Sequence, residues 1–205
     1  LPVLDLRFGH GEDAPWLDDF QTDARFTMLP TPKTFQGTLR PYQEIGYSWL
    51  QFVANTGLGV CLADDMGLGK TVQMIAVLAH QQVNKLAEGP SLIVCPMSVV
   101  GNWARELERF APSLRVLVHH GGDRSNQRTF VDSAGEYDAI ITTYNLIVRD
   151  QTSFLSCRWW NIILDEAQNI KNPNTKQSVA VRSLRGCNRY CLTGTPVENR
   201  LIELW

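Results

Sequence analysis

Short apolar runs rich in valine and isoleucine alternate with helix-like segments from residue 58 to the end of the chain. The runs read LGVCLAD, SLIVCP, LRVLVHH, YDAIITTY, WNIILDEA and NRYCLTGTP. A strand that is apolar on both faces must be covered on both faces, which is typical of parallel strands joined by crossover helices. The sequence therefore predicts an α/β fold with a mostly parallel β-sheet and helices on both of its faces.

A seam rich in proline, glycine and threonine precedes this region. The stretch LPTPKTFQGTLRP, residues 29–41, is predicted to form a loop or turns rather than a helix or strand. We place a boundary near residue 36, which leaves 1–35 as an N-terminal segment and 36–205 as the main domain. The aromatic residues before it include Trp16, Phe20, Phe26 and Phe35. They either cover one side of the sheet or end a preceding domain.

Composition limits the classes of function. The 205 residues are 44% hydrophobic and 20% charged, which suffices for one full core. No apolar run reaches the ~18 residues of a membrane helix, so we expect no membrane partner. A net charge of -2 means that any nucleic-acid binding is local. The five cysteines form no C-x-x-C pair, which favours buried thiols in a reducing compartment over a metal site.

The segment LADDMGLGKTVQ ends in a phosphate-loop signature, although Asp64 stands where the usual pattern has its first glycine. The signature residues are Gly67, Gly69, Lys70 and Thr71. They follow a strand predicted over 58–63 and open a helix predicted to end near residue 85, where backbone N–H groups and the helix N-terminus favour an anion. Lys70 is then placed to reach the β- and γ-phosphates of a nucleotide, and Thr71 to ligate Mg²⁺. The alternative is a capped helix with an exposed lysine.

Two adjacent acids end the apolar run IILDEA. In a parallel sheet this strand end lies at the same edge as the phosphate loop. Asp165 is suited to hold Mg²⁺, directly or through water, and Glu166 to orient or deprotonate an attacking water. The alternative is that both are helix-start acids stabilised by the helix dipole.

Six fragments fall in a familiar order along the chain. They are LRPYQEIGYSWL, LADDMGLGKT, PMSVVGNWARELERFAP, IITTYNLI, LDEAQNIKN and YCLTGTPVENRLIELW. Together they resemble the Q-type motif and motifs I, Ia, Ib, II and III of the Swi2/Snf2 family of superfamily 2 helicase-like ATPases. The resemblance spans about residues 39–205 and implies the first RecA-like P-loop lobe of a DNA-dependent ATPase, with ATP and Mg²⁺ as cofactors.

The resemblance also implies roles for single residues. Family loops commonly read Asp-Glu-x-Gly-Leu-Gly-Lys-Thr, so Asp64 fits the family pattern, and Asp65 replaces the usual glutamate. The implied nucleotide-binding residues are Arg40, Gln43, Asp65, Met66, Gly67, Leu68, Gly69, Lys70 and Thr71, with Thr71 and Asp165 at the metal. Gln43 resembles the glutamine that reads adenine; otherwise it simply belongs to a helix start after Pro41.

The implied catalytic residues are Lys70, Asp165, Glu166 and Gln168. Gln168 gives the chain a D-E-A-Q box in place of the commoner D-E-A-H box, and it is implied to couple the nucleotide to motif III. Motif III corresponds to Thr193, Gly194 and Thr195, for which a plain strand-end turn is the alternative.

Motifs Ia and Ib imply contacts with one strand of a DNA duplex. The implied DNA-binding residues are Pro96, Ser98, Asn102, Thr142, Thr143 and Lys171. Small hydroxyls and strand-end N–H groups suit phosphate oxygens, which position a protein without reading sequence. Lys171 either joins these contacts or solvates a loop. We expect Trp103 in the core rather than stacked on a base, and structural roles for His119 and His120.

The expected function is ATP-driven movement along double-stranded DNA that remodels protein–DNA complexes. Expected partners are duplex DNA, a second RecA-like lobe of the same protein, and RNA polymerase or other DNA-bound proteins. An ATP-gated DNA-binding module without productive hydrolysis, and an RNA-polymerase-remodelling or protein-docking factor of the same fold, stay open.

The chain starts at Leu1 and stops at Trp205 inside a helix-like run, so we expect it to be part of a longer protein. Because the second lobe supplies arginines to the γ-phosphate in the family, we expect the isolated lobe to be inactive or nearly so. The motifs resemble those of bacterial and archaeal members, which favours a cytoplasmic, nucleoid-associated protein. A eukaryotic source would place it in the nucleus.

Overall fold

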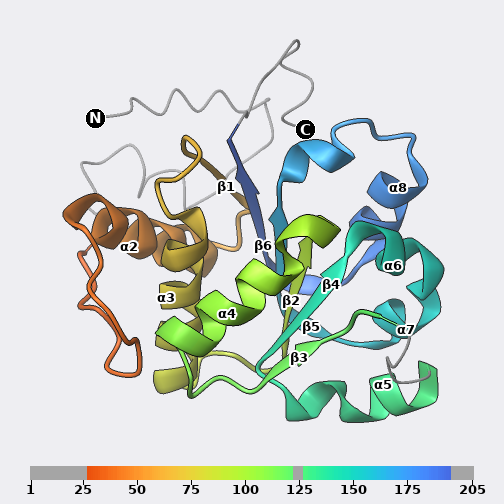
Figure 1. Cartoon of the computed structure of the whole chain (residues 1–205), viewed down its shortest axis with the longest axis horizontal. Helices are drawn as coiled ribbons and strands as arrows, with labels where there is room; N and C mark the ends of the chain where they lie inside the picture. The colour runs from red at the N-terminus through yellow and green to blue at the C-terminus, as the bar shows by residue number, and fades with distance from the viewer. Residues whose placement is uncertain (1–26, 122–126, 195–205) are drawn as a thin grey trace.

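The strands form one parallel sheet in the computed structural model, which describes residues 27–121 and 127–194 (Figure 1). They are β1 (Val60–Ala63), β2 (Ser91–Cys95), β3 (Val116–Val118), β4 (Ala139–Thr143), β5 (Trp159–Asp165) and β6 (Gly186–Thr193). Their order across the sheet is β1-β6-β5-β2-β4-β3, and every neighbouring pair is parallel. The predicted α/β class is therefore confirmed.

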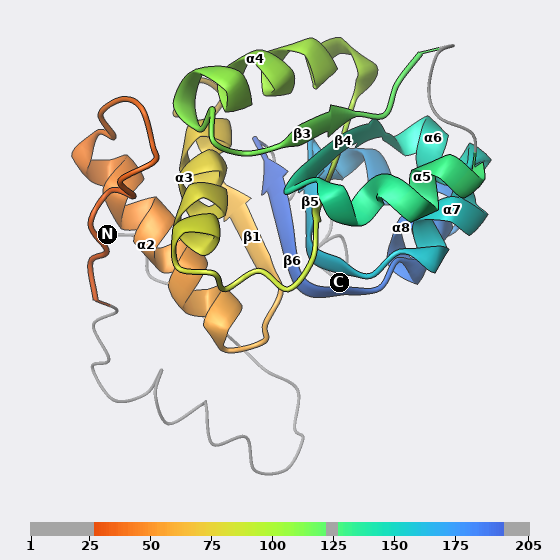
Figure 2. The same cartoon turned by 90° about the horizontal axis from the view of Figure 1, so that it is seen from below.

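Helices cover both faces of this sheet, as Figures 1 and 2 show. One layer contains α2 (Pro41–Asn55), α3 (Lys70–Val83) and α4 (Val100–Phe110), and the other α5 (Gln127–Ser133), α6 (Tyr144–Arg149), α7 (Gln151–Ser156) and α8 (Lys176–Ser183). The short 3-10 turns are η1 (Met97–Val99), η2 (Ala134–Glu136) and η3 (Ala167–Ile170).

Alternate side chains of the central strands enter two separate cores. In β2, Ile93 packs in the core under α2, α3 and α4, whereas Leu92 and Val94 pack in the core under the other helices. Every residue of β2 and β4 is buried for this reason. The two-sided burial explains why these strands are continuously apolar in the sequence.

The predicted elements agree closely with the observed ones. The strand predicted over 58–63 is β1, the helix predicted from Lys70 ends at Val83, and the helix predicted near Lys176 is α8. The run ENRLIELW lies outside the described residues. No helix in the described ranges is long and apolar enough to cross a membrane.

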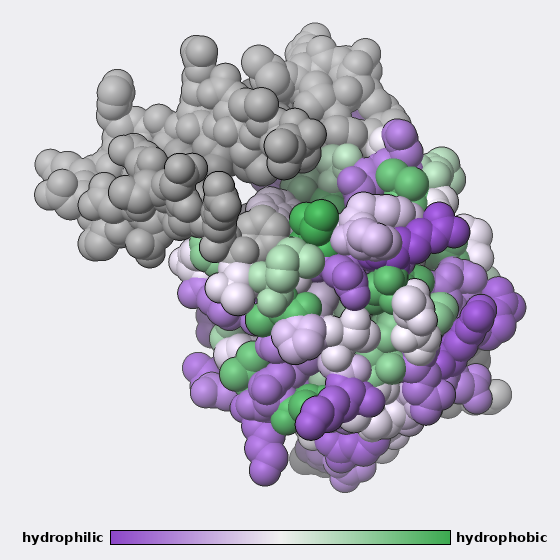
Figure 3. All heavy atoms as spheres, turned by 90° about the vertical axis from the view of Figure 1, so that its left-hand side faces the viewer, coloured by the Kyte–Doolittle hydropathy of each residue, from purple (hydrophilic) through white to green (hydrophobic). Residues whose placement is uncertain are grey.

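The described chain before α2 already packs on the main domain. The amide N–H of Leu29 donates to Ser48 Oγ at 3.0 Å. The ring of Phe35 is buried and stacks on Phe110, with ring centroids 5.5 Å apart. Phe35 thus joins the core beside α4, while Trp16, Phe20 and Phe26 lie outside the described residues, and the boundary near residue 36 stays a prediction. Seen from the α2 side, the surface mixes polar and apolar residues (Figure 3).

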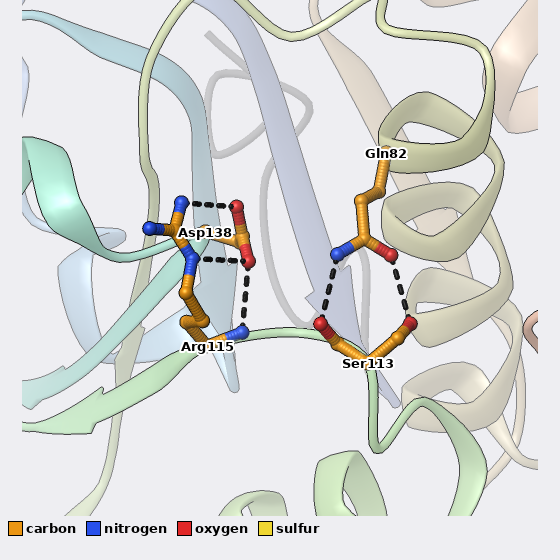
Figure 4. Close-up of polar contacts among 4 residues, drawn as sticks. All are labelled: Gln82, Ser113, Arg115 and Asp138. Atoms are coloured by element: carbon orange, nitrogen blue, oxygen red, sulfur yellow. Dashed lines mark hydrogen bonds and ion pairs between the residues drawn. The ribbon is translucent and has the colours of Figure 1, made fainter.

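The amino ends of the strands are fastened by side-chain hydrogen bonds (Figure 4). Gln82 of α3 and Ser113 exchange two bonds, of 2.9 and 2.8 Å. Asp138, just before β4, accepts bonds from Arg115 N, Nε and Nη2 at 2.8, 3.2 and 3.1 Å. Burial acts to raise the pKa of Asp138, but these bonds outweigh it and hold the pKa below its ordinary value. The bonds at this edge therefore have a structural role: they hold the segment before β3 to α3 and to the start of β4.

A network of buried amides ties the first helix layer to the sheet. Asn161 of β5 is fully buried, and its Nδ2 donates to Gln81 Oε1 at 2.7 Å and to Ser91 Oγ at 2.8 Å. Its Oδ1 accepts from Asn188 Nδ2 at 3.1 Å. Gln81 Nε2 in turn donates to Gln51 Oε1 of α2 at 3.1 Å. A movement of α2 or α3 relative to β5 would break these bonds and leave buried polar groups without partners. The network therefore fixes both helices relative to the strand.

We predict that Asn161→Ala lowers the free energy of unfolding by about 2 to 3 kcal/mol, since it leaves several buried polar groups without partners. The matched control is Asn55→Ala, because Asn55 accepts a bond from Gln51 Nε2 at the exposed end of the same network. Water can replace that bond, so we expect a loss below about 1 kcal/mol. Urea denaturation of the chain measures both, and equal losses would contradict the prediction.

Candidate active site

The carboxyl ends of the parallel strands gather the predicted site residues at one edge of the sheet. Here the phosphate loop, residues 64–69, joins β1 to α3. Gly67 and Gly69 have φ values of 85° and 79°, in the left-handed region that favours glycine. Lys70 Nζ donates to the carbonyl oxygens of Asp64 and Asp65 at 2.6 and 3.0 Å. The ammonium group therefore lies inside the curve of the loop, beside the N-terminus of α3, where an anion is favoured.

The start of α2 contacts the phosphate loop. Gln43 is buried; its Oε1 accepts from Arg40 N at 2.9 Å, and its Nε2 donates to the carbonyl oxygen of Leu68 at 3.2 Å. The hydroxyl of Tyr42 donates to the same carbonyl at 3.2 Å. Gln43 thus belongs to the helix start and also touches the phosphate loop, whereas its role in reading adenine stays a prediction.

The loop also packs on the end of β6. Met66 is 82% exposed, yet a Cβ added at Gly194 would lie 3.2 Å from Met66 Cγ. β1 and β6 are neighbouring strands, with Ala63 paired to Thr193. The phosphate loop and the described part of motif III are therefore in contact, while Thr195 lies outside the described residues.

Asp165 ends β5 and is held at both carboxylate oxygens. Oδ2 accepts a bond from the indole Nε1 of Trp103 at 2.8 Å, and Oδ1 accepts from the backbone N–H of Glu166 at 3.0 Å. Burial raises the pKa of Asp165 above its ordinary value, although these two bonds oppose the shift. A nearby cation would stabilise such a carboxylate.

Trp103 lies in the core, as expected, with 1% of its surface exposed. Its bond to Asp165 was not predicted, because the two residues are 62 positions apart and no local pattern connects them.

Glu166, Gln168 and Thr193 form a chain of side chains. Glu166 adopts φ 49° and ψ 54°, a left-handed conformation that is uncommon for a residue with a side chain. Gln168 Nε2 donates to Glu166 Oε2 at 2.6 Å, and Gln168 Oε1 accepts from Thr193 Oγ1 at 2.8 Å. The amide bridges the two because it has both a donor and an acceptor. A carboxylate therefore connects to the end of β6 through one side chain.

The possible metal ligands are oxygen atoms. Thr71 lies on the first turn of α3, and Asp165 lies at the end of β5 on the same edge of the sheet. A hydroxyl and a carboxylate fit Mg²⁺, which takes few protein ligands and keeps several waters. In the described part of the chain no group of three His, Cys, Asp or Glu side chains could hold a metal, and the described cysteines are free.

A cleft of about 570 Å³ opens at the same edge of the sheet, beyond the ends of β2 and β4. Its lining includes Pro96, His120, Thr143, Asn145, Arg149 and Gln177. Arg149 is exposed, and Gln177 Nε2 of α8 donates to Asn145 Oδ1 of α6 at 2.7 Å. The sequence did not indicate Asn145, Arg149 or Gln177, because α6 and α8 meet only in the fold.

The predicted DNA-binding residues differ in accessibility. Pro96 lines the cleft, Ser98 and Lys171 are exposed, and Asn102 is partly buried, with its Nδ2 donating to Glu106 Oε1 at 2.8 Å. Thr143 Oγ1 accepts from Leu146 N at 3.4 Å and so caps α6.

Thr142 requires a correction. It is 0% exposed, because it belongs to a strand that is covered on both faces, and its hydroxyl has no hydrogen-bond partner. The Thr142 hydroxyl is therefore not available to a phosphate oxygen in this conformation.

The two histidines occupy different places. His119 is buried, with its ring 4.4 Å from Phe130 and its Nε2 3.4 Å from Asp150 Oδ2. This placement agrees with a structural role. His120 instead lines the cleft, so it lies within reach of whatever binds there.

Comparison with known proteins connects this geometry to one family. The family model described as the SNF2-related domain matches residues 42–205. The bacterial ATP-dependent helicase/translocase YwqA of Bacillus subtilis is 51% identical over 172 residues, which are 84% of this chain and 19% of YwqA. Helicase SWR1 of Debaryomyces hansenii is 44% identical over 191 residues, which are 92% of this chain and 12% of SWR1.

A solved structure is also similar. The SWI2/SNF2 ATPase core of Sulfolobus solfataricus in complex with double-stranded DNA matches with a TM-score of 0.79 and 46% identity, covering 88% of this chain and 36% of that chain. The same archaeal core domain in a structure described without DNA matches with a TM-score of 0.77. The chain thus spans a minor part of the length of each of these relatives.

We predict that Gly69→Ala weakens ATP binding about tenfold or more. A Cβ at this position would lie 2.5 Å from Gln43 Nε2, so Gln43 must move away from the loop. The control is Gly57→Ala, because Gly57 has a similar φ of 76° but no atom within 4 Å of an added Cβ. It suffers the same backbone strain without displacing Gln43. Calorimetric titration measures both, and unchanged affinity in Gly69→Ala would refute the role of this contact.

Proposed function

The chain belongs to the SNF2-related domain family, and from this premise we propose that it is the first RecA-like, ATP-binding lobe of a DNA-dependent ATPase. The whole protein moves along double-stranded DNA and remodels protein–DNA complexes. One observation carries the proposal: the phosphate loop around Lys70, the buried carboxylate of Asp165 and the chain from Glu166 to Thr193 converge at one sheet edge. These are the parts that phosphoryl transfer to water requires.

Each residue at this edge has a chemical task in the proposed reaction. Lys70 opposes the charge of the β- and γ-phosphates, since its ammonium group already lies inside the loop. Thr71 and Asp165 would hold Mg²⁺, and the ion when bound neutralises phosphate charge. Glu166 orients the attacking water and takes its proton. Gln43 positions the base from the start of α2, through its contact with the loop.

The Gln168 amide keeps the Glu166 carboxylate in place. Its two bonds hold Glu166 to Thr193 at the end of β6. We propose that this bridge is the route by which motif III, including Gly194 and Thr195, senses the state of the nucleotide. The alternative of a module without hydrolysis is disfavoured, because Lys70, Asp165 and Glu166 are all present and lie at one sheet edge.

Duplex DNA is the proposed ligand of the cleft beyond the ends of β2 and β4. The similar archaeal core is described as a complex with double-stranded DNA. Exposed Ser98, Lys171 and Arg149, together with Asn102 and the strand-end N–H groups after β2 and β4, suit phosphate oxygens. Such contacts position the lobe without reading sequence, as a protein that moves along DNA requires.

The proposal includes a second RecA-like lobe, which completes the catalytic site. Without it we expect this lobe to be inactive or nearly so. We propose a cytoplasmic protein at the nucleoid rather than a nuclear one, because the bacterial relative, at 51% identity, is more similar to the chain than the fungal one, at 44%. The proteins that it displaces would then include RNA polymerase or other DNA-bound factors.

The chemical test is Glu166→Gln in the full-length protein with duplex DNA. We expect ATP affinity within about threefold of the wild type and turnover lowered by about 10² to 10⁴, because an amide cannot take a proton from water. Lys70→Ala should instead lose ATP binding. The control is Glu108→Gln, an exposed glutamate of α4. Turnover at the wild-type rate in Glu166→Gln would remove Glu166 from the mechanism.

The DNA contacts are tested by salt dependence. Loss of one phosphate contact in Arg149→Ala should reduce the slope of log affinity against log salt by about 0.9, equally for unrelated duplex sequences. The control is Lys33→Ala, which removes the same charge from an exposed position outside the cleft. Fluorescence anisotropy at several salt concentrations measures the slope. A slope unchanged from the wild type in Arg149→Ala would show that Arg149 does not contact a phosphate.

A further inference from the structure

Two buried aromatic side chains hold Asp165 from two different segments. The indole Nε1 of Trp103 donates to the Oδ2 atom of Asp165 at 2.8 Å, and the hydroxyl of Tyr144 donates to its backbone carbonyl oxygen at 2.8 Å. Trp103 is 1% exposed and Tyr144 is 4% exposed. A tyrosine hydroxyl carries its proton at neutral pH, so this group can donate the bond. Asp165 is thus fixed at its side chain by one residue and at its backbone by the other.

Each aromatic residue belongs to a segment that carries proposed DNA contacts. Trp103 follows Asn102 in α4, and the preceding turn η1 contains exposed Ser98. Tyr144 follows Thr143 at the first residue of α6 and itself lines the cleft. A displacement of either segment by a bound duplex would therefore move a hydrogen-bond donor of Asp165.

We propose that Trp103 and Tyr144 are positioning residues that transmit the placement of the DNA-contacting segments to the metal-binding carboxylate. This inference rests on the proposed function, because it assigns the connection between its two sites. It also gives a role to two aromatic residues that would otherwise count only as core.

The two bonds control different parts of the site. Asp165 Oδ1 is occupied by the N–H of Glu166, so the bond from Trp103 to Oδ2 sets the rotation of the carboxylate. The bond from Tyr144 holds the peptide unit between Asp165 and Glu166, just before the chain turns into the left-handed conformation of Glu166. Trp103 therefore orients the metal ligand, and Tyr144 aims the proposed general base. Outer partners of this kind typically change metal affinity or activity 10- to 100-fold.

The chain offers a matched control for each residue. Trp159 is also buried, and its Nε1 donates to the carbonyl oxygen of Phe154 at 3.0 Å, without contact to Asp165. Tyr47 is also buried, and its hydroxyl lies 2.8 Å from His80 Nδ1. Replacing these residues by phenylalanine removes the same atoms as in the test variants, so it reports the cost of the lost volume or hydroxyl alone.

The first experiment measures ATP turnover of the full-length protein against Mg²⁺ concentration, with and without duplex DNA. Trp103→Phe should raise the Mg²⁺ concentration for half-maximal turnover about tenfold or more. Tyr144→Phe should lower the stimulation by DNA, expressed as the ratio of the two rates. ATP binding without Mg²⁺ should stay unchanged in both, and Trp159→Phe and Tyr47→Phe should behave as the wild type.

The second experiment needs no turnover. The full-length protein is labelled with 5-fluorotryptophan, and the fluorine-19 resonance of position 103 is assigned by its absence in Trp103→Phe. Addition of duplex DNA should shift this resonance while leaving that of Trp159 in place, and Tyr144→Phe should reduce the shift.

The outcomes separate this inference from the proposed function. A wild-type protein that neither binds duplex DNA nor is stimulated by it would refute the proposed function. A wild type that is stimulated, with Trp103→Phe and Tyr144→Phe keeping its Mg²⁺ dependence and stimulation ratio, would overturn the inference alone. So would equal losses in the test and control variants, because the effect would then be one of folding. Losses confined to the test variants support it.

Discussion

The parallel pairing of the six strands in the described residues is the constraint on which the rest depends. Because all strands run the same way, the segments that follow β1, β2, β4, β5 and β6 must emerge at one edge. The strand direction alone therefore brings the functional segments to the same edge of the sheet. These segments are the phosphate loop, the two segments with proposed DNA contacts, the paired acids and the described part of motif III. β5 pairs with β2 on one side and with β6 on the other, so Asp165 lies between the end of β2, which is followed by the segment of Trp103, and the end of β6.

Helices α2 and α3 carry Gln43 and Lys70, so their position on the sheet decides where a nucleotide can lie. The amide network from Gln51 through Gln81 to Asn161 fixes that position from the far end of both helices. An apolar core would accept small sliding movements of a helix, whereas hydrogen-bonded amides accept few alternative registers. Rigidity at one end of the helices thus supports precision at the other end.

The sequence predicted the features that are local in the chain. Two-sided apolar strands, the glycines before Lys70 and the acids at the end of β5 each depend on residues close together in sequence, and their elements were confirmed. The bond from Trp103 to Asp165 joins residues 62 positions apart, and the cleft joins α6 to α8, so neither had a local pattern. Thr142 shows that the sequence does not determine how exposed a hydroxyl near a strand end is. Its exposure depends on how the strand is covered in the folded sheet, and Thr142 is buried.

The left-handed backbone of Glu166 has a consequence for the robustness of the protein. Such a conformation typically costs about 1 to 3 kcal/mol for a residue with a side chain, and glycine would adopt it without that strain. A glycine here would make the turn easier to form but would remove the carboxylate. Selection for thermal stability alone would therefore favour glycine at this position, whereas selection for catalysis would keep the glutamate. At this turn, a gain in thermal stability would come with a loss of activity.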